Sequence, residues 1–415
     1  MRGREREAES VFPEATRLRM IAGSLAAERA SQCVAQGALA EAEAALREAI
    51  HQTPEAPALY QSLGVVLDRA GKHAEATLAF RKATQLAPGD LAAHVALALA
   101  YRRRGIWSEE ALAYARAVDL RPADASLQFE LGRALSADGR FADAVPAFRE
   151  AVRLAPNEAD FQLELGIALG RIGRHLEAEA HLRDALRLDP ASLVAHANLA
   201  LGMGRQGRHL EAEAAYRAAI RLDPSNPRLH RGLGVTLFFL REYTAAEAAF
   251  REAVRLRPDY VTAHTDLGEL FAEQAEHARA VAAFQDALLI NPRHAAALRG
   301  LGAALFAQGL HADAELTLRR ALDRTPDDAR VHFQLWDVLE SQGKYAEAAQ
   351  ACRDAIAIKA DFAGAHVRLG RALLRLGRFV EASAAYRNAL RLAPNDEIAR
   401  AGLERAIELS GLRET

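Results

Sequence analysis

Three patterns in the sequence contain residues of the kinds that carry out chemistry, and the first is a run of glycines. Residues 202–207 read GMGRQG, which matches the GxGxxG spacing that holds a pyrophosphate in dinucleotide-binding proteins. That chemistry requires a β-strand before the glycines and a helix that begins after them. Here the glycines come at the end of an amphipathic helical segment, and Gly207 falls at a turn. We therefore interpret the run as structural.

The second pattern is a set of histidines separated by 34 residues or by multiples of 34. They are His94, His196, His230, His264, His332 and His366. A metal ion needs ligand atoms within about 2 Å of itself, whereas equivalent atoms on successive helix pairs lie about 10 Å apart. We therefore expect these imidazoles to pack amphipathically at the helix interface, and we predict no metal site.

The third pattern is the pair of cysteines, Cys33 and Cys352. Both fall on core-facing positions, and they lie too far apart along an array of helices for a disulfide, which needs Cα atoms within about 7 Å. We interpret them as small buried hydrophobic residues. The sequence has no Ser-His-Asp arrangement, GxxxxGK[ST] loop or CxxC pair. It therefore predicts a protein that is not an enzyme and binds no cofactor.

Composition narrows both the fold class and the kind of partner. Half of the 415 residues are hydrophobic but only 6% are aromatic, which favours closely packed helices over sheets. Lys and Arg number 53 and Asp and Glu 55, so the net charge of −2 provides no general attraction for nucleic acid or anionic membranes. No apolar run is long enough for a signal peptide or a membrane span. We expect an all-α chain that is soluble and cytoplasmic, with no nucleic-acid or membrane partner.

The elements that must position any site are helices in a repeat of 34 residues. With Gly23 counted as position 1, position 32 is a proline that stops the second helix of the repeat. The prolines in step are Pro54, Pro88, Pro122, Pro156, Pro190, Pro224, Pro258, Pro292, Pro326 and Pro394, with Ala360 in the gap. Position 15 is usually glycine, which adopts the left-handed backbone that ends the first helix at least cost.

Other positions indicate how the two helices of a repeat pack. Position 7 is Leu, position 8 is Gly or Ala, positions 20 and 27 are Ala, and position 24 is a larger side chain. In residues 193–226 these are Leu199, Ala200, Ala212, Ala219 and Tyr216. Small and large residues thus alternate across the interface, as dense helix packing requires. The repeat is predicted to be two amphipathic helices joined by a glycine turn.

This pattern of positions 7, 8, 20, 24, 27 and 32 resembles the tetratricopeptide repeat family. The resemblance covers residues 23–396 as eleven tandem repeats. It implies a right-handed superhelical α-solenoid of stacked antiparallel helix pairs, with a concave wall lined by the first helices. Residues 1–22 match no repeat and are predicted to be a charged N-terminal tail or an extra helix. Residues 397–415 are predicted to be a C-terminal capping helix, which an open solenoid end needs.

Two kinds of departure interrupt the pattern. Trp336 occupies the small position 8 and Cys352 the bulky position 24 of the same repeat, which we interpret as a compensating pair. Arg241 and Ala275 replace the turn glycine. We expect softer junctions there, with the fastest amide exchange among internal repeats at residues 235–280 and 335–362.

The resemblance implies that the concave wall is formed mainly from positions 2, 5, 6, 9, 12 and 13, and we predict a partner-binding groove there. Its predicted residues are Arg102, Arg103, Arg133, Arg171, Asn198, Arg205, Phe238, Phe239, Asp266, Glu269 and Arg299. The groove is segmented in charge, basic before the two phenylalanines and largely acidic after them. The family's carboxylate clamp does not map, because Asn198 is the only Asn at position 6.

These features favour a non-catalytic protein-protein interaction scaffold that binds a partner polypeptide segment in the groove. Acidic stretches of the partner would meet the arginines, and an apolar anchor would meet Phe238 and Phe239. The alternative is a regulatory or substrate-recruiting arm of a larger enzyme, such as a protein kinase or a glycosyltransferase. A third interpretation is self-association through the terminal faces.

Overall fold

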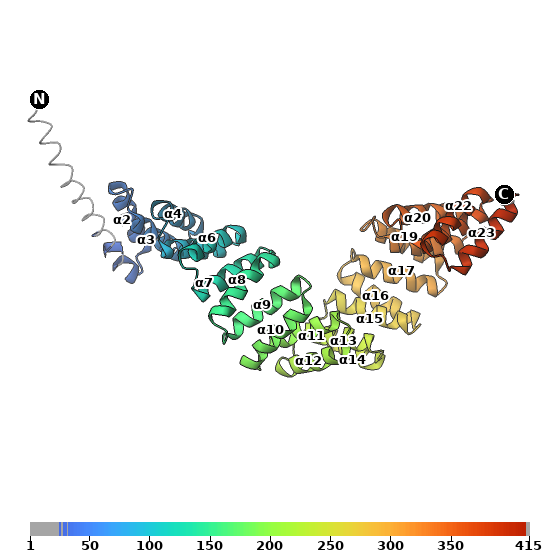
Figure 1. Ribbon diagram of the computed structural model, residues 1–415, viewed down its shortest axis with the longest axis horizontal. Coiled ribbons are helices and arrows are strands. Elements are labelled where there is room, and N and C mark those ends of the chain that lie inside the picture. Colours follow the sequence, from blue (N-terminus) through green and yellow to red (C-terminus); the bar gives the residue numbers. More distant parts are fainter. Residues whose placement is uncertain (1–24, 26–27, 31, 412–415) are drawn as a thin grey trace, which may run out of the picture. The chain divides into compact units, whose positions relative to one another are not determined.

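A computed structural model describes Leu25, residues 28–30 and residues 32–411. The chain divides into two compact units, Met1–Gly207 and Arg208–Thr415, which we term the N-terminal and C-terminal units. Within each unit, consecutive helices form antiparallel pairs, and each pair packs on the next pair along the chain (Figure 1). Every regular element among the described residues is a helix. The predicted all-α solenoid of stacked helix pairs is confirmed.

The N-terminal unit alternates first and second helices of the repeat. The first helices are α3 (Pro57–Arg69), α5 (Leu91–Arg103), α7 (Ala125–Ala137), α9 (Ala159–Arg171) and α11 (Leu193–Arg205). The second helices are α2 (Leu39–Gln52), α4 (His73–Leu86), α6 (Trp107–Leu120), α8 (Phe141–Leu154) and α10 (His175–Leu188). The predicted N-terminal tail, residues 1–22, lies outside the described residues.

The C-terminal unit continues the same alternation. Its second helices are α12 (His209–Leu222), α14 (Tyr243–Leu256), α16 (His277–Ile290), α18 (His311–Leu322), α20 (Tyr345–Ile358) and α22 (Phe379–Leu392). Its first helices are α13 (Pro227–Phe239), α15 (Val261–Glu273), α17 (Ala295–Ala307), α19 (Ala329–Ser341) and α21 (Ala363–Arg375). A last helix, α23 (Glu397–Ser410), buries Ala399 and Ala406 in the same core cluster as Tyr386 of α22.

The two helices of a repeat are fitted together by the side chain at position 24, which lies directly on the backbone of position 8. A Cβ atom added to Gly132 or Gly268 would come within 2.6 Å of the ring of Phe148 or Phe284, respectively. Both rings are fully buried. The glycine therefore has a steric reason: a methyl group at position 8 would displace the ring that fills the repeat.

The histidines at position 4 form hydrogen bonds that were not predicted from the sequence. Each bonds a backbone carbonyl in the loop before its helix, six residues earlier: His94 to Pro88 at 2.9 Å, His196 to Pro190 at 3.1 Å, His230 to Pro224 at 2.9 Å, His264 to Pro258 at 3.0 Å, His332 to Pro326 at 2.9 Å and His366 to Ala360 at 3.3 Å. Because Nε2–H donates to a carbonyl, these imidazoles join successive repeats through the loop. The side chains are half-buried or buried, so these bonds add to the expected packing at the helix interface and do not contradict it.

Two turns keep the left-handed backbone without glycine. Arg241 has φ 62° and Ala275 has φ 57°, whereas the equivalent Gly309 has φ 79°. A side chain in this region costs about 1–2 kcal/mol, because Cβ approaches the following carbonyl oxygen. The sequence-based expectation of softer junctions at these turns therefore has a local physical cause, and the exchange rates remain a prediction.

Ala275→Gly is expected to raise the free energy of unfolding by up to about 1 kcal/mol. The strain relieved exceeds the entropy that glycine adds to the unfolded chain. The matched change Gly309→Ala is expected to lower stability by a similar amount. Urea unfolding followed by circular dichroism measures both, and a destabilised Ala275→Gly variant would contradict the strain at this turn.

The exceptional pair in the repeat that contains α19 and α20 is buried in one core cluster. Trp336 is 2% exposed and Cys352 0%. The ring that usually stands at position 24 is at position 8 here, and the small residue is at position 24. Burial raises the pKa of the Cys352 thiol to about 12, so the thiol stays protonated and packs as an apolar group. Trp336 Nε1 is buried without a hydrogen-bond partner.

If the two residues compensate, restoring the common pair should be far less harmful than changing either residue alone. Trp336→Gly leaves a cavity and Cys352→Phe overfills the core, so each should cost about 2–4 kcal/mol. The double variant should lose less stability than either single variant, so the two losses should be strongly non-additive. Additive losses in the free energy of unfolding would show that the two sites do not interact.

Candidate functional site

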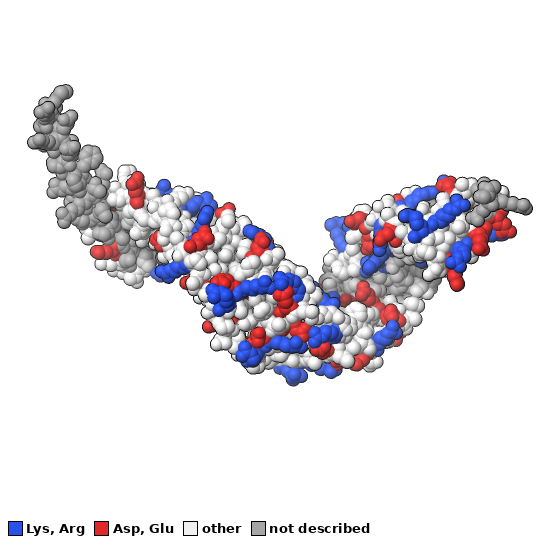
Figure 2. Space-filling model, viewed as in Figure 1, with Lys and Arg blue, Asp and Glu red and all other residues white. Residues whose placement is uncertain are grey.

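All eleven predicted partner-contacting residues lie on first helices of the repeats. In the N-terminal unit they are Arg102 and Arg103 on α5, Arg133 on α7, Arg171 on α9, and Asn198 and Arg205 on α11. In the C-terminal unit they are Phe238 and Phe239 on α13, Asp266 and Glu269 on α15, and Arg299 on α17. Figure 2 shows acidic and basic side chains interspersed on the face in view. Which charges are already paired within the fold therefore decides which of them can attract a partner.

Arg102 is taken up by an internal network. Its side chain is 28% exposed, bonds Glu110 on α6 at 2.6 Å and pairs with Glu130 on α7. Burial lowers the pKa of Arg102, but the hydrogen bonds with Glu130 and Glu110 outweigh this effect and raise the pKa. Arg133 lies 3.4 Å from the same Glu130. This network links two consecutive repeats.

Glu110 stands where most repeats have a small alanine, and it is 1% exposed. Burial raises the pKa of its carboxyl, although the hydrogen bond from Arg102 opposes the change. One of its oxygens, Oε2, is buried with no hydrogen-bond partner. The folded state therefore binds the Glu110 proton more tightly than the unfolded chain does.

Replacing Glu110 should change how stability depends on pH. With the folded pKa above its ordinary value near 4.5, this carboxyl makes the free energy of unfolding fall as pH rises through the folded pKa. Glu110→Gln cannot titrate, so the variant should gain stability relative to the native chain over that range. Urea unfolding from about pH 4 to about pH 8 measures the difference. A difference that does not change with pH would contradict the raised pKa.

Arg103 is paired through a second internal arrangement, which we term the Asp68 site. It consists of Asp68 on α3, His73 on α4 and Arg103 on α5. Asp68 Oδ1 accepts a hydrogen bond from His73 Nδ1 at 2.9 Å, and Asp68 Oδ2 pairs with Arg103. The Asp68 side chain is 15% exposed. One carboxylate thus satisfies an imidazole of its own repeat and a guanidinium of the next.

Arg171 and Arg205 are different, because both are exposed and neither has a carboxylate within 4 Å among the described residues. They occupy the same position of two consecutive first helices, α9 and α11. The Arg171 guanidinium carbon lies 5.7 Å from the ring centre of Phe141. On the predicted basic segment, these two are the cations that the fold leaves without an acid.

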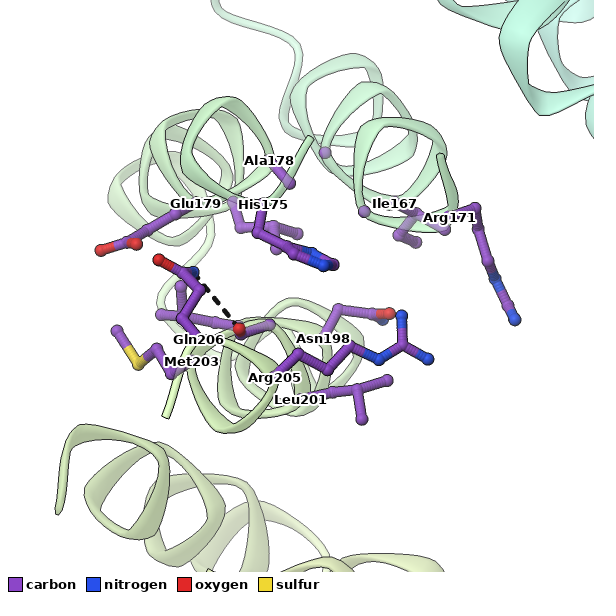
Figure 3. A pocket seen from close by; sticks show the side chains of 15 residues that line it. Ile167, Arg171, His175, Ala178, Glu179, Asn198, Leu201, Met203, Arg205 and Gln206 are labelled. Carbon is purple, nitrogen blue, oxygen red and sulfur yellow. Dashed lines mark hydrogen bonds between the residues drawn. The ribbon is translucent and has the colours of Figure 1, made fainter. Parts of the chain in front are cut away.

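A pocket lies beside these two arginines, between α9, α10 and α11, with about 460 Å³ of empty space including the part open to solvent. Three helices and the residue after the last of them line the pocket. Helix α9 contributes Ile167, Gly170 and Arg171, and α10 contributes His175, Ala178, Glu179 and Leu182. Helix α11 contributes Asn198, Leu201, Gly202, Met203 and Arg205, and Gln206 follows it. In Figure 3, Asn198, Arg205 and the His175 imidazole lie toward one side of the pocket, and Met203, Gln206 and Glu179 toward the other. Polar groups thus lie on both sides of the pocket, and apolar residues such as Leu182 and Leu201 also line it.

Missing side chains make this space. Gly202 stands at position 10, where the four preceding repeats bury Val66, Ala100, Ala134 and Ala168. A Cβ at Gly202 would meet no atom within 4 Å, and one at Gly170 would meet only the Ala178 Cβ, at 3.8 Å. The glycine run at residues 202–207 is structural, as predicted, but its first glycine also opens the pocket.

His175 and Gly170, which line this pocket, were not predicted from the sequence. Nδ1 of His175 is buried and has no hydrogen-bond partner. Asn198, which was predicted, donates from Nδ2 to the carbonyl of Val194 at 2.8 Å. A signal was present in the sequence. Position 12 is glycine in two consecutive repeats, at Gly170 and Gly204, whereas the three repeats before them have the polar residues Asp68, Arg102 and Ser136.

In the C-terminal unit, the two predicted phenylalanines are not equivalent. Phe239 is 60% exposed, and its ring stacks on that of His209 with centroids 4.9 Å apart. Phe238 is half-buried, and its ring lies 6.0 Å from that of Tyr243. Phe239 is therefore the residue of the two that can offer an apolar surface to a partner.

The charged residues predicted in the C-terminal unit are mostly paired between consecutive repeats. Asp266 lies 2.5 Å from Arg231, and burial raises the pKa of its carboxyl against the effect of that arginine. Arg299 lies 3.4 Å from Asp328. Glu269 is exposed and forms no ion pair with any residue that the structure describes. Of the two predicted acids, Asp266 is thus neutralised within the fold and Glu269 is not.

Among the described residues, no group of three or more His, Cys, Asp or Glu side chains could hold a metal ion. None of their helices has the length and apolar character needed to cross a membrane.

The stacked helix pairs define a helical-repeat protein of the α-solenoid class, and family models identify the repeat. Two tetratricopeptide repeat models match, one at residues 28–90, 265–329 and 313–361 and the other at residues 339–407. The chain is a tetratricopeptide repeat protein. Residues 87–291 also match the model described as the C-terminal domain of cilia and flagella-associated protein 70.

Matches to solved structures are at low sequence identity. The crystal structure of yeast Tom70 is 16% identical, with 94% of this chain and 96% of that chain covered and a TM-score of 0.48. A tetratricopeptide repeat protein from Parabacteroides merdae is 20% identical over 60% of this chain and 98% of that chain, with a TM-score of 0.48. The pilF protein of Pseudomonas aeruginosa is 20% identical over 52% and 98%, with a TM-score of 0.47. No curated protein matches the sequence.

Proposed function

We propose that the chain is a non-catalytic scaffold that binds a polypeptide segment of another protein on the first-helix face of its N-terminal unit. The observation that carries this proposal is the pair of exposed arginines, Arg171 and Arg205, which have no acid partner beside an open pocket. Tetratricopeptide repeat domains typically mediate protein-protein interactions, which is consistent with such a role.

Apolar residues on the same face support a polypeptide ligand. Position 9 of the first helices carries exposed Val65, Leu99 and Leu201, which are 44%, 40% and 44% exposed. Val194 on α11 is another exposed apolar residue, at 49%. Burying such side chains contributes about 25 cal/mol per Å² of apolar area, while the cations add orientation and faster association. A segment with alternating acidic and apolar residues would match both features.

In the C-terminal unit, Phe239 is the proposed anchor for an apolar side chain of a partner, because its ring is the more exposed of the predicted pair. Aromatic residues in such positions are frequent centres of binding energy. The same faces would also serve the alternative role of a regulatory or substrate-recruiting arm of a larger enzyme.

Reversing the two unpaired cations should abolish binding of acidic partners. The double variant Arg171→Glu, Arg205→Glu is expected to lose proteins that the native chain captures from lysate at low salt, because attraction becomes repulsion. The matched control Arg121→Glu, Arg387→Glu makes the same change of net charge at exposed arginines away from this face. Quantitative mass spectrometry of the captured proteins provides the measurement.

The control variant should retain the native set of captured proteins. Undiminished capture by the Arg171→Glu, Arg205→Glu variant would contradict the proposed binding face. Equal loss in both double variants would show that net charge, and not this face, governs capture.

A further inference from the structure

The Asp68 site has a counterpart three repeats later in which one member is missing. Three repeats of 34 residues add 102 to each number, so Asp68, His73 and Arg103 correspond to Gly170, His175 and Arg205. The imidazole and the guanidinium are kept, and the carboxylate is replaced by a hydrogen atom. Both sites lie within the N-terminal unit.

The loss leaves two groups unsatisfied. His73 Nδ1 bonds Asp68, whereas His175 Nδ1 is buried without a partner. Arg103 pairs with Asp68, whereas Arg205 pairs with no carboxylate among the described residues. Because leaving a buried polar atom without a hydrogen bond is unfavourable, a ligand that bonds His175 Nδ1 is stabilised by doing so.

We propose that this pocket binds the side-chain carboxylate of an aspartate or glutamate in an acidic partner segment, in the place that Asp68 takes in the earlier repeat. The inference rests on the proposed function and specifies its ligand chemistry. One carboxylate oxygen accepts from His175 Nδ1–H and the other pairs with the Arg205 guanidinium, as the two oxygens of Asp68 do. Arg171 adds a second cation at the opening.

The other charged group at the pocket does not oppose this ligand. Glu179 pairs with Arg183 at 2.5 Å, and its side chain is 7% exposed. Figure 3 shows its carboxylate directed away from the His175 ring. The Asn198 amide and the apolar Ile167 and Leu201 border the opening. They would contact the residues that flank the bound acid.

Filling the pocket from within the chain tests the proposal. A side chain at position 170 has room, because a Cβ there meets only Ala178 at an ordinary distance of 3.8 Å. Gly170→Asp restores the carboxylate that the earlier repeat has, and Gly170→Asn introduces the same shape without the charge. Thermal unfolding first establishes that both variants fold as the native chain does.

The probe is a fluorescein-labelled peptide of alternating Asp and Leu, acetylated and amidated at its ends, with binding followed by anisotropy at low salt. Gly170→Asp is expected to weaken binding at least about tenfold, and Gly170→Asn less than about threefold, since each tenfold change corresponds to about 1.4 kcal/mol. The same peptide with Asn in place of Asp should bind neither chain. Equal affinity of native and Gly170→Asp chains would overturn the proposal.

A second variant tests for gain of binding. The double variant Asp68→Gly, Gly170→Asp leaves the Asp68 site without its carboxylate while the pocket at residue 170 is filled. Peptide binding, lost in the Gly170→Asp single variant, should return at the Asp68 site. If it does not return, Asp68 is not a stand-in for the ligand. Tighter binding of an Asp-free peptide with a free carboxyl terminus, or of one with phosphoserine for Asp, would assign the pocket to another anion and overturn the choice of a side-chain carboxylate.

The proposed binding face and the proposed carboxylate site can be tested separately. If Arg171→Glu, Arg205→Glu abolishes peptide binding while Gly170→Asp leaves it unchanged, the binding face stands and the carboxylate site is wrong. If neither change affects binding, the proposed function is wrong as well.

Discussion

The structure depends on one repeated contact, the side chain at position 24 lying against a backbone that has no side chain of its own at position 8. Phe148 on Gly132 and Phe284 on Gly268 are instances of it, with no space for a methyl group between ring and backbone. Because this contact fixes how the two helices of a repeat approach each other, it also fixes which positions of the first helix are left to face outward. At Trp336 and Cys352 the large side chain is at position 8 and the small one at position 24, so the same space is filled from the other helix.

Most of the charged side chains predicted to line the groove form ion pairs within the fold. Arg102 pairs with Glu110 of its own repeat and with Glu130 of the next, and Arg231 pairs with Asp266 of the next repeat. In both cases an acid on one first helix lies beside a base on the neighbouring first helix. The proposed binding site lies where this pairing is broken. At Gly170 the acid is missing, and the imidazole and guanidinium that it would have satisfied are retained.

Much of the fold could be predicted from the sequence, because positions 7, 8, 15, 24 and 32 carry steric requirements that few residue types meet. The candidate site was less accessible. The arginines were predicted on the correct helices, but the sequence could not distinguish Arg102 from Arg205. Arg102 pairs with Glu130 and Glu110, which are 28 and 8 residues away in the sequence. Arg205 pairs with no carboxylate among the described residues. The loop hydrogen bonds of the position-4 histidines were missed for the same reason: they depend on how the chain turns at the proline. His175 went unnoticed because its importance comes from a neighbour that is absent.

A crystal structure of the native chain with the bound Asp-Leu peptide would test the central claim most directly. The account predicts a peptide carboxylate within hydrogen-bonding distance of both His175 Nδ1 and the Arg205 guanidinium, superimposable on the carboxylate of Asp68 when the two sites are overlaid. A peptide bound with its carboxylates elsewhere, and with His175 Nδ1 bonded only to water, would contradict it.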